Sequence, residues 1–408
     1  MSISPISKKL SDFVKQDLLS KVPRSMPGFG QDSAEFLKSV YDSLIQTDHV
    51  WKTEFSDIRE LDPNGVHAPV SSYIPDTIRN KIVSDLKDRR VFVFVWGNRT
   101  IKIHMIYSKP HSGSGMSNRV ILGMIYRIFL WLSIVFRYAS ANCARELDIF
   151  LYMTKEVKRL PQSPTGIIDR EHVNTAFTTS CQPKIEIHIF REEEWFKVFI
   201  HESFHCFGLD FSGMAGTSEL GDRVIKEHYH LKGEIDLRIY EAYTETWAEI
   251  LYLFIYGFLQ SKKRTWETVF RHFAKSLKIE QAFSIFQCCK VLSHNGLSYR
   301  NICAGTMGAY NEKSHVFSYY ILKSALLFYA SDFIRWCITH NGGGGRKGTM
   351  AFRQTSQNID AFCKLLIGSL CQTGYLSVVS EIEQIGLYDN PSFRKSVVGN
   401  TLRMTVHG

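Results

Sequence analysis

The spacing of hydrophobic positions changes twice along the chain. Residues 1–85 carry apolar side chains at helical spacing, most clearly over residues 31–45. Residues 86–275 mix short β-rich runs with longer helical patterns, and residues 276–408 return to helical spacing almost throughout. We therefore predict an α+β fold in which helical N-terminal (1–85) and C-terminal (276–408) regions flank a central domain over residues 86–275.

The central segment predicts a small mixed sheet. Residues 91–96 and 101–107 are β-rich runs on either side of a short glycine-containing loop, which is typical of a hairpin. In the second run Lys102 and His104 alternate with apolar residues, so we expect both on the solvent side. The later elements are expected in the order helix, strand and edge strand, at residues 116–138, 147–153 and 185–190.

One predicted helix combines an apolar surface with candidate chemistry. It begins near Trp195 and contains the run His-Glu-Ser-Phe-His at residues 201–205. Residues four apart share a helix face, so His201 and His205 can present two imidazoles to one metal ion. Glu202 is adjacent to the first histidine and can act as general base towards the attacking water. The alternative is a buried helix with two hydrogen-bonded histidines and an exposed glutamate.

This run, together with an acidic helix downstream, resembles the gluzincin branch of the zincin metallopeptidases. In that family a second helix supplies a glutamate ligand, and an acidic residue four positions later holds a metal-binding histidine. Here a heavily apolar helical pattern runs from about Glu234 to Gln260. The resemblance implies a zincin-like fold in which Glu241 is the third zinc ligand and Glu245 supports a ligand histidine. Glu249 extends the same stripe by one turn.

A second resemblance, to the metzincin branch, offers another third ligand. In that branch a glycine turns the chain and a ligand follows three residues later. Gly208 fits this pattern, but Phe211 occupies the ligand position and cannot bind zinc. Asp210 would serve only after a local shift, and Met307 matches the family's methionine turn loosely. A helix C-cap explains Gly208 more simply, so Glu241 is preferred and Asp210 remains the alternative.

Several other polar residues are candidates for supporting roles. Zincins commonly supply a histidine or tyrosine that stabilises the oxyanion, which makes His315 a candidate, followed by Tyr319 and Tyr320. The alternative is a helix-capping region with core aromatics. His228 and His230 lie in a predicted polar connector over residues 211–233, and we expect them to be an exposed pair rather than a metal site.

Composition narrows the function less than these motifs do. The chain has 408 residues, 44% of them hydrophobic, and a formal net charge of +9 that is scattered rather than clustered, so we expect no specific nucleic-acid partner. Its nine cysteines form no regular spacing, which predicts reduced, buried thiols inside a cell. We expect no signal peptide, and we expect residues 120–136 to be a buried helix rather than a transmembrane segment.

The string from residue 171 to residue 211 also resembles uncharacterised predicted metallopeptidases of large nucleocytoplasmic DNA viruses. That resemblance implies a viral protein of the host cytoplasm or the virion that processes other viral proteins. We therefore predict Zn²⁺-dependent hydrolysis of a peptide or protein substrate, with His201, His205 and Glu241 as ligands. Two alternatives are a zincin-fold structural or virion protein without turnover, and a nucleic-acid-associated protein with structural zinc.

Overall fold

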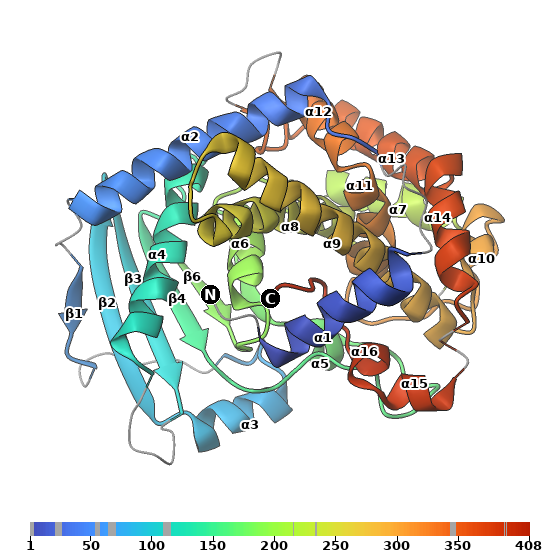
Figure 1. Cartoon of the computed structure of the whole chain (residues 1–408), viewed down its shortest axis with the longest axis horizontal. Coiled ribbons are helices and arrows are strands. Elements are labelled where there is room, and N and C mark those ends of the chain that lie inside the picture. The colour runs from blue at the N-terminus through green and yellow to red at the C-terminus, as the bar shows by residue number, and fades with distance from the viewer. Residues whose placement is uncertain are drawn as a thin grey trace. The chain divides into compact units, whose positions relative to one another are not determined.

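The computed structural model in Figure 1 describes residues 4–20, 27–53, 58–63, 71–108, 116–214, 216–232, 235–342, 348–386, 388 and 390–408. Contacts group the chain into two compact units. Unit 1 comprises Met1–Phe36, Lys158–Asn174 and Met214–Gly408, and unit 2 comprises Leu37–Val157 and Thr175–Gly213. The chain therefore passes from one unit to the other four times.

Unit 2 is built on a mixed sheet of six strands within the described ranges. They are β1 (Arg59–Leu61), β2 (Asp88–Trp96), β3 (Arg99–Tyr107), β4 (Glu146–Tyr152), β5 (Ala176–Thr178) and β6 (Lys184–Ile189), in the order β1-β2-β3-β4-β6-β5. The pairs β3–β4 and β4–β6 are parallel, and the other pairs are antiparallel. The predicted hairpin is confirmed as β2–β3, and Gly97 provides the positive φ (59°) that its turn needs.

The strand that precedes the histidine-containing helix is not at the edge of this sheet. β6 lies between β4 and β5, so β5 is the outermost strand on that side among those described. The expectation that residues 185–190 form the edge strand is wrong. β5 has only three residues, which is too short a run to give a period-two signal in the sequence.

One face of the sheet is covered by the helix α4 (Asn118–Val135), which Figure 1 shows lying across the strands. Phe129 of α4 contacts Phe94 and Trp96 of β2, with ring centroids 6.1 and 4.3 Å apart. By length and apolar composition α4 is the single described helix that could cross a membrane. Ten of its residues are buried against the rest of the protein, as the prediction of a buried helix requires.

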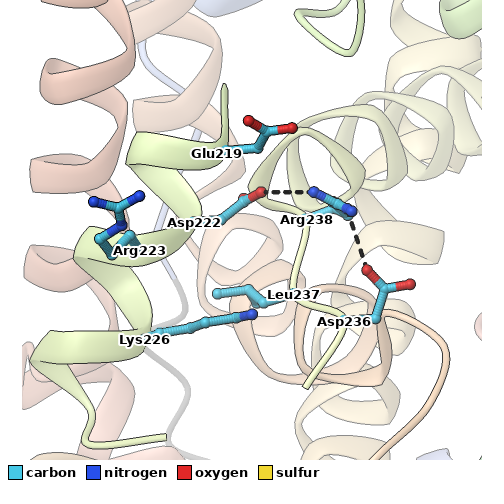
Figure 2. A pocket seen from close by; sticks show the side chains of 7 residues that line it. All are labelled: Glu219, Asp222, Arg223, Lys226, Asp236, Leu237 and Arg238. Carbon is cyan, nitrogen blue, oxygen red and sulfur yellow. Dashed lines mark ion pairs between the residues drawn. The ribbon is translucent and has the colours of Figure 1, made fainter. Parts of the chain in front are cut away.

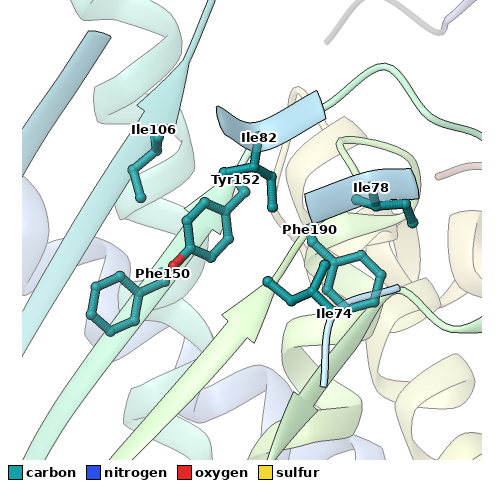
Figure 3. Packing of buried hydrophobic residues seen from close by; sticks show 7 residues of the cluster. All are labelled: Ile74, Ile78, Ile82, Ile106, Phe150, Tyr152 and Phe190. Atoms are coloured by element: carbon teal, nitrogen blue, oxygen red, sulfur yellow. The ribbon is translucent and has the colours of Figure 1, made fainter. Parts of the chain in front are cut away.

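The opposite face is also covered. Isoleucines of α3 (Asp76–Asp85) and the segment before it pack on β3 and β4, and Figure 3 shows this cluster of Ile74, Ile78, Ile82, Ile106, Phe150, Tyr152 and Phe190. Beside it His104 is only 1% exposed, stacks on Phe150 at 4.1 Å and pairs through Nε2 with Asp148 at 2.7 Å. The prediction that His104 faces solvent is therefore wrong, because alternation assigns a residue to a face but does not say whether that face is covered.

Unit 1 is mostly helical. The long helices α8 (Ile239–Gln260) and α9 (Trp266–His294) pack along each other (Figure 1). The other helical elements are α1 (Pro5–Phe13), η1 (Val14–Leu18), α2 (Gln31–Thr53, continuing into unit 2), α5 (Arg170–Val173), α7 (Thr217–His228), α10 (Tyr299–Cys303), η3 (Phe317–Leu322), α11 (Lys323–Phe328), α12 (Ala330–Asn341), α13 (Ser356–Leu370), α14 (Thr373–Glu383), α15 (Pro391–Lys395) and α16 (Val397–Asn400).

The last residues of the chain are part of the core of unit 1. Residues 401–406 are buried, and side chains of α9 and α11 bind their backbone. Gln287 donates to the carbonyl of Thr401 (3.2 Å), and Glu280 accepts from the amide of Val406 (2.8 Å). Lys323 donates to the carbonyl of Met404 (3.2 Å). Residues 401–406 are therefore buried without being helical, and side chains satisfy hydrogen bonds of their backbone.

Candidate metal centre

The helix α6 (Trp195–Cys206) carries the two histidines, and every one of its residues is buried. It starts after Glu194, whose φ is 60°, and is followed by Gly208, whose φ is 65°. The amide of Leu209 donates to the carbonyl of Phe204 (2.8 Å), which closes the last turn around the glycine. The predicted glycine C-cap is confirmed. A left-handed residue at each end therefore fixes where this helix begins and stops.

His201 and His205 point their Nε2 atoms at each other, 3.2 Å apart. Two nitrogens held about 2.0–2.1 Å from one tetrahedral ion would be separated by about 3.3 Å. Two facing nitrogen lone pairs repel each other unless a proton or a cation lies between them. The observed separation and orientation are therefore compatible with two ligands of one metal ion.

Asp210 fixes the tautomer of His205. Its Oδ2 lies 2.5 Å from Nδ1 of His205, its Oδ1 accepts from Ser212 Oγ (2.9 Å), and the residue is 1% exposed. A carboxylate on Nδ1 keeps the proton there and leaves the Nε2 lone pair for a metal. Asp210, the alternative third ligand, thus contacts Nδ1 of His205 and not the Nε2 side of the ring. The sequence analysis predicted such a supporting role for Glu245, and the contact of Asp210 with His205 was not predicted.

The structure contains a possible metal-binding group formed by His201, His205 and Glu241. All three are buried, each offers one ligand atom, and these atoms lie within 4.8 Å of one another. No second group of this kind occurs among the described residues. Two imidazoles and one carboxylate form a donor set used by catalytic zinc, although imidazole also suits other transition metals.

Charged residues that line the pocket in Figure 2 contact the first turn of α8, which carries Glu241. The pocket has a volume of about 240 Å³ and is lined by Glu219, Asp222, Arg223, Lys226, Asp236, Leu237 and Arg238. Asp222 accepts from the amide of Ile239, the first residue of α8, at 2.8 Å. Arg238 lies 3.5 Å from Asp222 and 3.2 Å from Asp236. Burial raises the pKa of Asp222 to about 6 despite these favourable contacts.

Asp222→Asn is expected to flatten the dependence of stability on pH. Because the folded-state pKa of Asp222 is about 6 and its ordinary value is 3.8, the folded protein binds this proton more tightly than the unfolded chain. The contribution of the protonated carboxyl to stability is complete below pH 3.8, and it is lost as the pH rises through about 6. At about 1.4 kcal/mol per pKa unit, the wild type loses up to about 3 kcal/mol that the variant keeps.

Urea unfolding of both proteins at intervals from pH 4 to pH 7 measures this difference. Glu219→Gln, at an exposed position of the same pocket, is the control and should follow the wild type. Parallel pH profiles for the wild type and Asp222→Asn would contradict the prediction.

His315 packs against the segment that leads into α8. Its Nδ1 donates to the carbonyl of Asp236 (2.6 Å), its φ is 53°, and Ser318 donates to the carbonyl of Arg238 (2.7 Å). Nδ1 is therefore protonated and bonded to the protein, and Nε2 is the ring nitrogen that could act on another group. Tyr320 is less suited to act on a substrate, because it is buried and its hydroxyl donates to the carbonyl of Leu402 (2.5 Å). Its neighbour Tyr319 contacts the His315 ring at 6.0 Å.

The connector predicted over residues 211–233 contains the helix α7, which the sequence pattern missed. Leu220 and Val224 of α7 are exposed, so its apolar positions do not mark one buried face. His228 and His230 near its end are exposed, as predicted, and His230 donates from Nδ1 to the carbonyl of Gly305 (2.6 Å). The metal-binding group found in the described ranges does not include them.

A disulfide lies at the C-terminal end of α6. Cys143 and Cys181 are bonded, and the amide of Cys181 donates to the carbonyl of His205 (3.4 Å). A Cβ at Gly208 would come 3.3 Å from the Cβ of Cys181, so glycine also allows this close approach. The prediction that the cysteines are reduced is wrong for this pair. Its sequence separation of 38 residues gives no spacing motif that would reveal it.

Comparison of this chain with protein-family models, with curated proteins and with solved structures gave no match.

Proposed function

We propose that this protein is a zinc-dependent peptidase that hydrolyses peptide bonds. The observation that carries the proposal is the pair of facing imidazoles on α6, with Nε2 atoms 3.2 Å apart and Asp210 on Nδ1 of His205. This arrangement supports the proposal because both Nε2 atoms point to the same place on one face of α6. We assign the role of general base to the adjacent Glu202, which is 7% exposed.

His201, His205 and Glu241 would hold the metal, and Asp210 would keep His205 in the binding tautomer. When bound, zinc polarises the scissile carbonyl and lowers the pKa of water. Glu202 takes a proton from the attacking water and passes it to the leaving amine, so that the hydroxyl joins the carbonyl carbon as the carbon–nitrogen bond breaks. His315, when protonated on both ring nitrogens, would donate from Nε2 to the developing oxyanion.

The substrate class in this proposal is an extended peptide segment. β5 is the outermost described strand beside α6, and a peptide adding to a sheet edge gains main-chain hydrogen bonds that do not depend on its sequence. The viral resemblance of residues 171–211 extends the proposal to viral proteins as substrates, in the host cytoplasm or the virion.

Metal content of the purified protein tests the proposal. We expect about one zinc per chain in the wild type and its loss in Glu241→Ala. Asp210→Ala should still bind zinc, with affinity lower by about 10–100-fold because only the support of His205 is removed. Isothermal titration with Zn²⁺ of the chelator-treated proteins gives the affinities, and mass spectrometry of the native proteins gives the stoichiometry.

Two outcomes would contradict the proposal in different ways. A wild type that takes up no zinc, even after reconstitution, would make the two histidines structural. A zinc-loaded wild type that cleaves no member of a diverse peptide library would favour the zincin-fold structural protein instead.

A further inference from the structure

Two exposed thiols meet where α10 and α13 end. The Sγ atoms of Cys303 and Cys371 lie 2.9 Å apart although 68 positions separate them in the sequence. A disulfide bond is about 2.0 Å long, so less than 1 Å of movement separates this contact from a covalent bond. The free cysteines of the described chain other than these two are all buried.

The fold holds the two sulfurs together through contacts on both sides. Tyr299, in the first turn of α10, donates its hydroxyl to the carbonyl of Leu370 (2.9 Å), next to Cys371. Its amide donates to Glu383 of α14 (2.7 Å). A capping box between Ser298 and Asn301 fixes the start of α10. The approach of the thiols is therefore built into the packing of these helices and does not depend on the cysteines themselves.

We propose that Cys303 and Cys371 form a redox-active dithiol that low-molecular-weight disulfides convert to a disulfide. The thiolate of one cysteine attacks the small disulfide, forms a mixed disulfide and releases one small thiol. The other cysteine then attacks the protein sulfur of that mixed disulfide and releases the second small thiol. The protein loses two hydrogen atoms and two electrons, and the small disulfide is reduced to two thiols.

The order of attack follows from the environments of the two thiols. Desolvation and the hydrogen bond with Cys371 raise the pKa of Cys303 to about 12, so Cys303 is protonated at neutral pH. Cys371 is therefore expected to attack first, and Cys303 to resolve the adduct. The buried thiols are poor competitors because they lack access to solvent, and burial raises the pKa of Cys288, for example, to about 12.

Bond formation would tie the end of α10 to the end of α13. A cross-link that closes a loop of this length restricts the unfolded chain, so the oxidised protein should melt several degrees above the reduced one. This site is independent of the proposed peptidase activity and does not involve the metal-binding group.

The test uses the full chain with the Cys143–Cys181 bond intact and oxidised glutathione as the probe. We expect the wild type to lose two hydrogens in its intact mass, without a stable adduct, and peptide mapping to link Cys303 to Cys371. Cys303→Ser should instead accumulate one glutathione on Cys371, because the resolving thiol is missing. The double variant Cys303→Ser/Cys371→Ser should show neither change.

Two results would overturn the proposal. In one, both wild-type thiols still react with iodoacetamide after exposure to oxidised glutathione. In the other, the wild type accumulates the same glutathione adduct as Cys303→Ser, which would show that Cys303 does not resolve it.

Discussion

Glu202→Gln is expected to retain zinc and to lose peptide hydrolysis by about 10²–10⁴-fold, the usual contribution of a positioned general base. The amide has nearly the same shape as the carboxylate and remains on the buried helix α6, so His201 and His205 keep their arrangement. It cannot accept a proton from the attacking water. Cleavage rates of the zinc-loaded proteins, with zinc content measured on the same samples, check the prediction.

A matched glutamate lies just before the same helix. Glu192 pairs with Lys155 at the surface, so Glu192→Gln should leave both zinc content and turnover unchanged. Unaltered turnover in Glu202→Gln would remove Glu202 from the mechanism. Loss of zinc in that variant would instead give Glu202 a structural part in the metal site.

Lys323→Met is expected to destabilise the protein by about 3–5 kcal/mol, because it leaves buried carboxylates without their cation. Lys323 lies 3.5 Å from Glu249, and their side chains are 2% and 0% exposed. Burial, followed by the charge of the neighbouring Glu249, raises the pKa of Glu280, which also interacts electrostatically with Lys323. Glu249 is thus part of a buried charge cluster in unit 1 and does not belong to a solvated acidic face.

Urea unfolding, with and without zinc, measures the loss. The double variant Glu249→Gln/Lys323→Met should recover most of it, because neither charge remains buried alone. Lys364→Met removes an exposed pair with Asp360 (side chains 77% and 61% exposed) and should leave the stability nearly unchanged. A loss in Lys323→Met as small as that of Lys364→Met would show that the buried pair contributes little.

Periodicity predicted the parts of the fold whose packing is reflected in their own sequence. The β2–β3 hairpin and the apolar helices α4, α8 and α9 carry long, regular patterns, and these elements occur in the structure. The pattern does not show where helices end, because the region after residue 316 has helical spacing but is divided into η3, α11 and α12. α7 and β5 were missed because one exposes apolar residues and the other has three positions. Their structure depends on neighbours that are distant in the sequence.

The candidate site divides in the same way. His201 and His205 were predicted as a pair because their spacing is local to one helix turn. The contact of Asp210 with Nδ1 of His205 depends on how the chain turns at Gly208, which spacing does not specify. The Cys143–Cys181 bond and the Cys303–Cys371 contact each join segments that are far apart in the sequence, so a count of cysteines could not reveal them.

The burial of residues 401–406 has a consequence for the order of events during synthesis. Unit 2 ends at Gly213, so all of its residues are translated before residues 214–406 of unit 1. Unit 1 cannot complete its core until residues 401–406 emerge, since α9 and α11 bind their backbone. Domains of nascent chains generally fold as their residues become available. The helix with the two histidines is therefore expected to form before unit 1 has completed the core that contains the helix carrying Glu241.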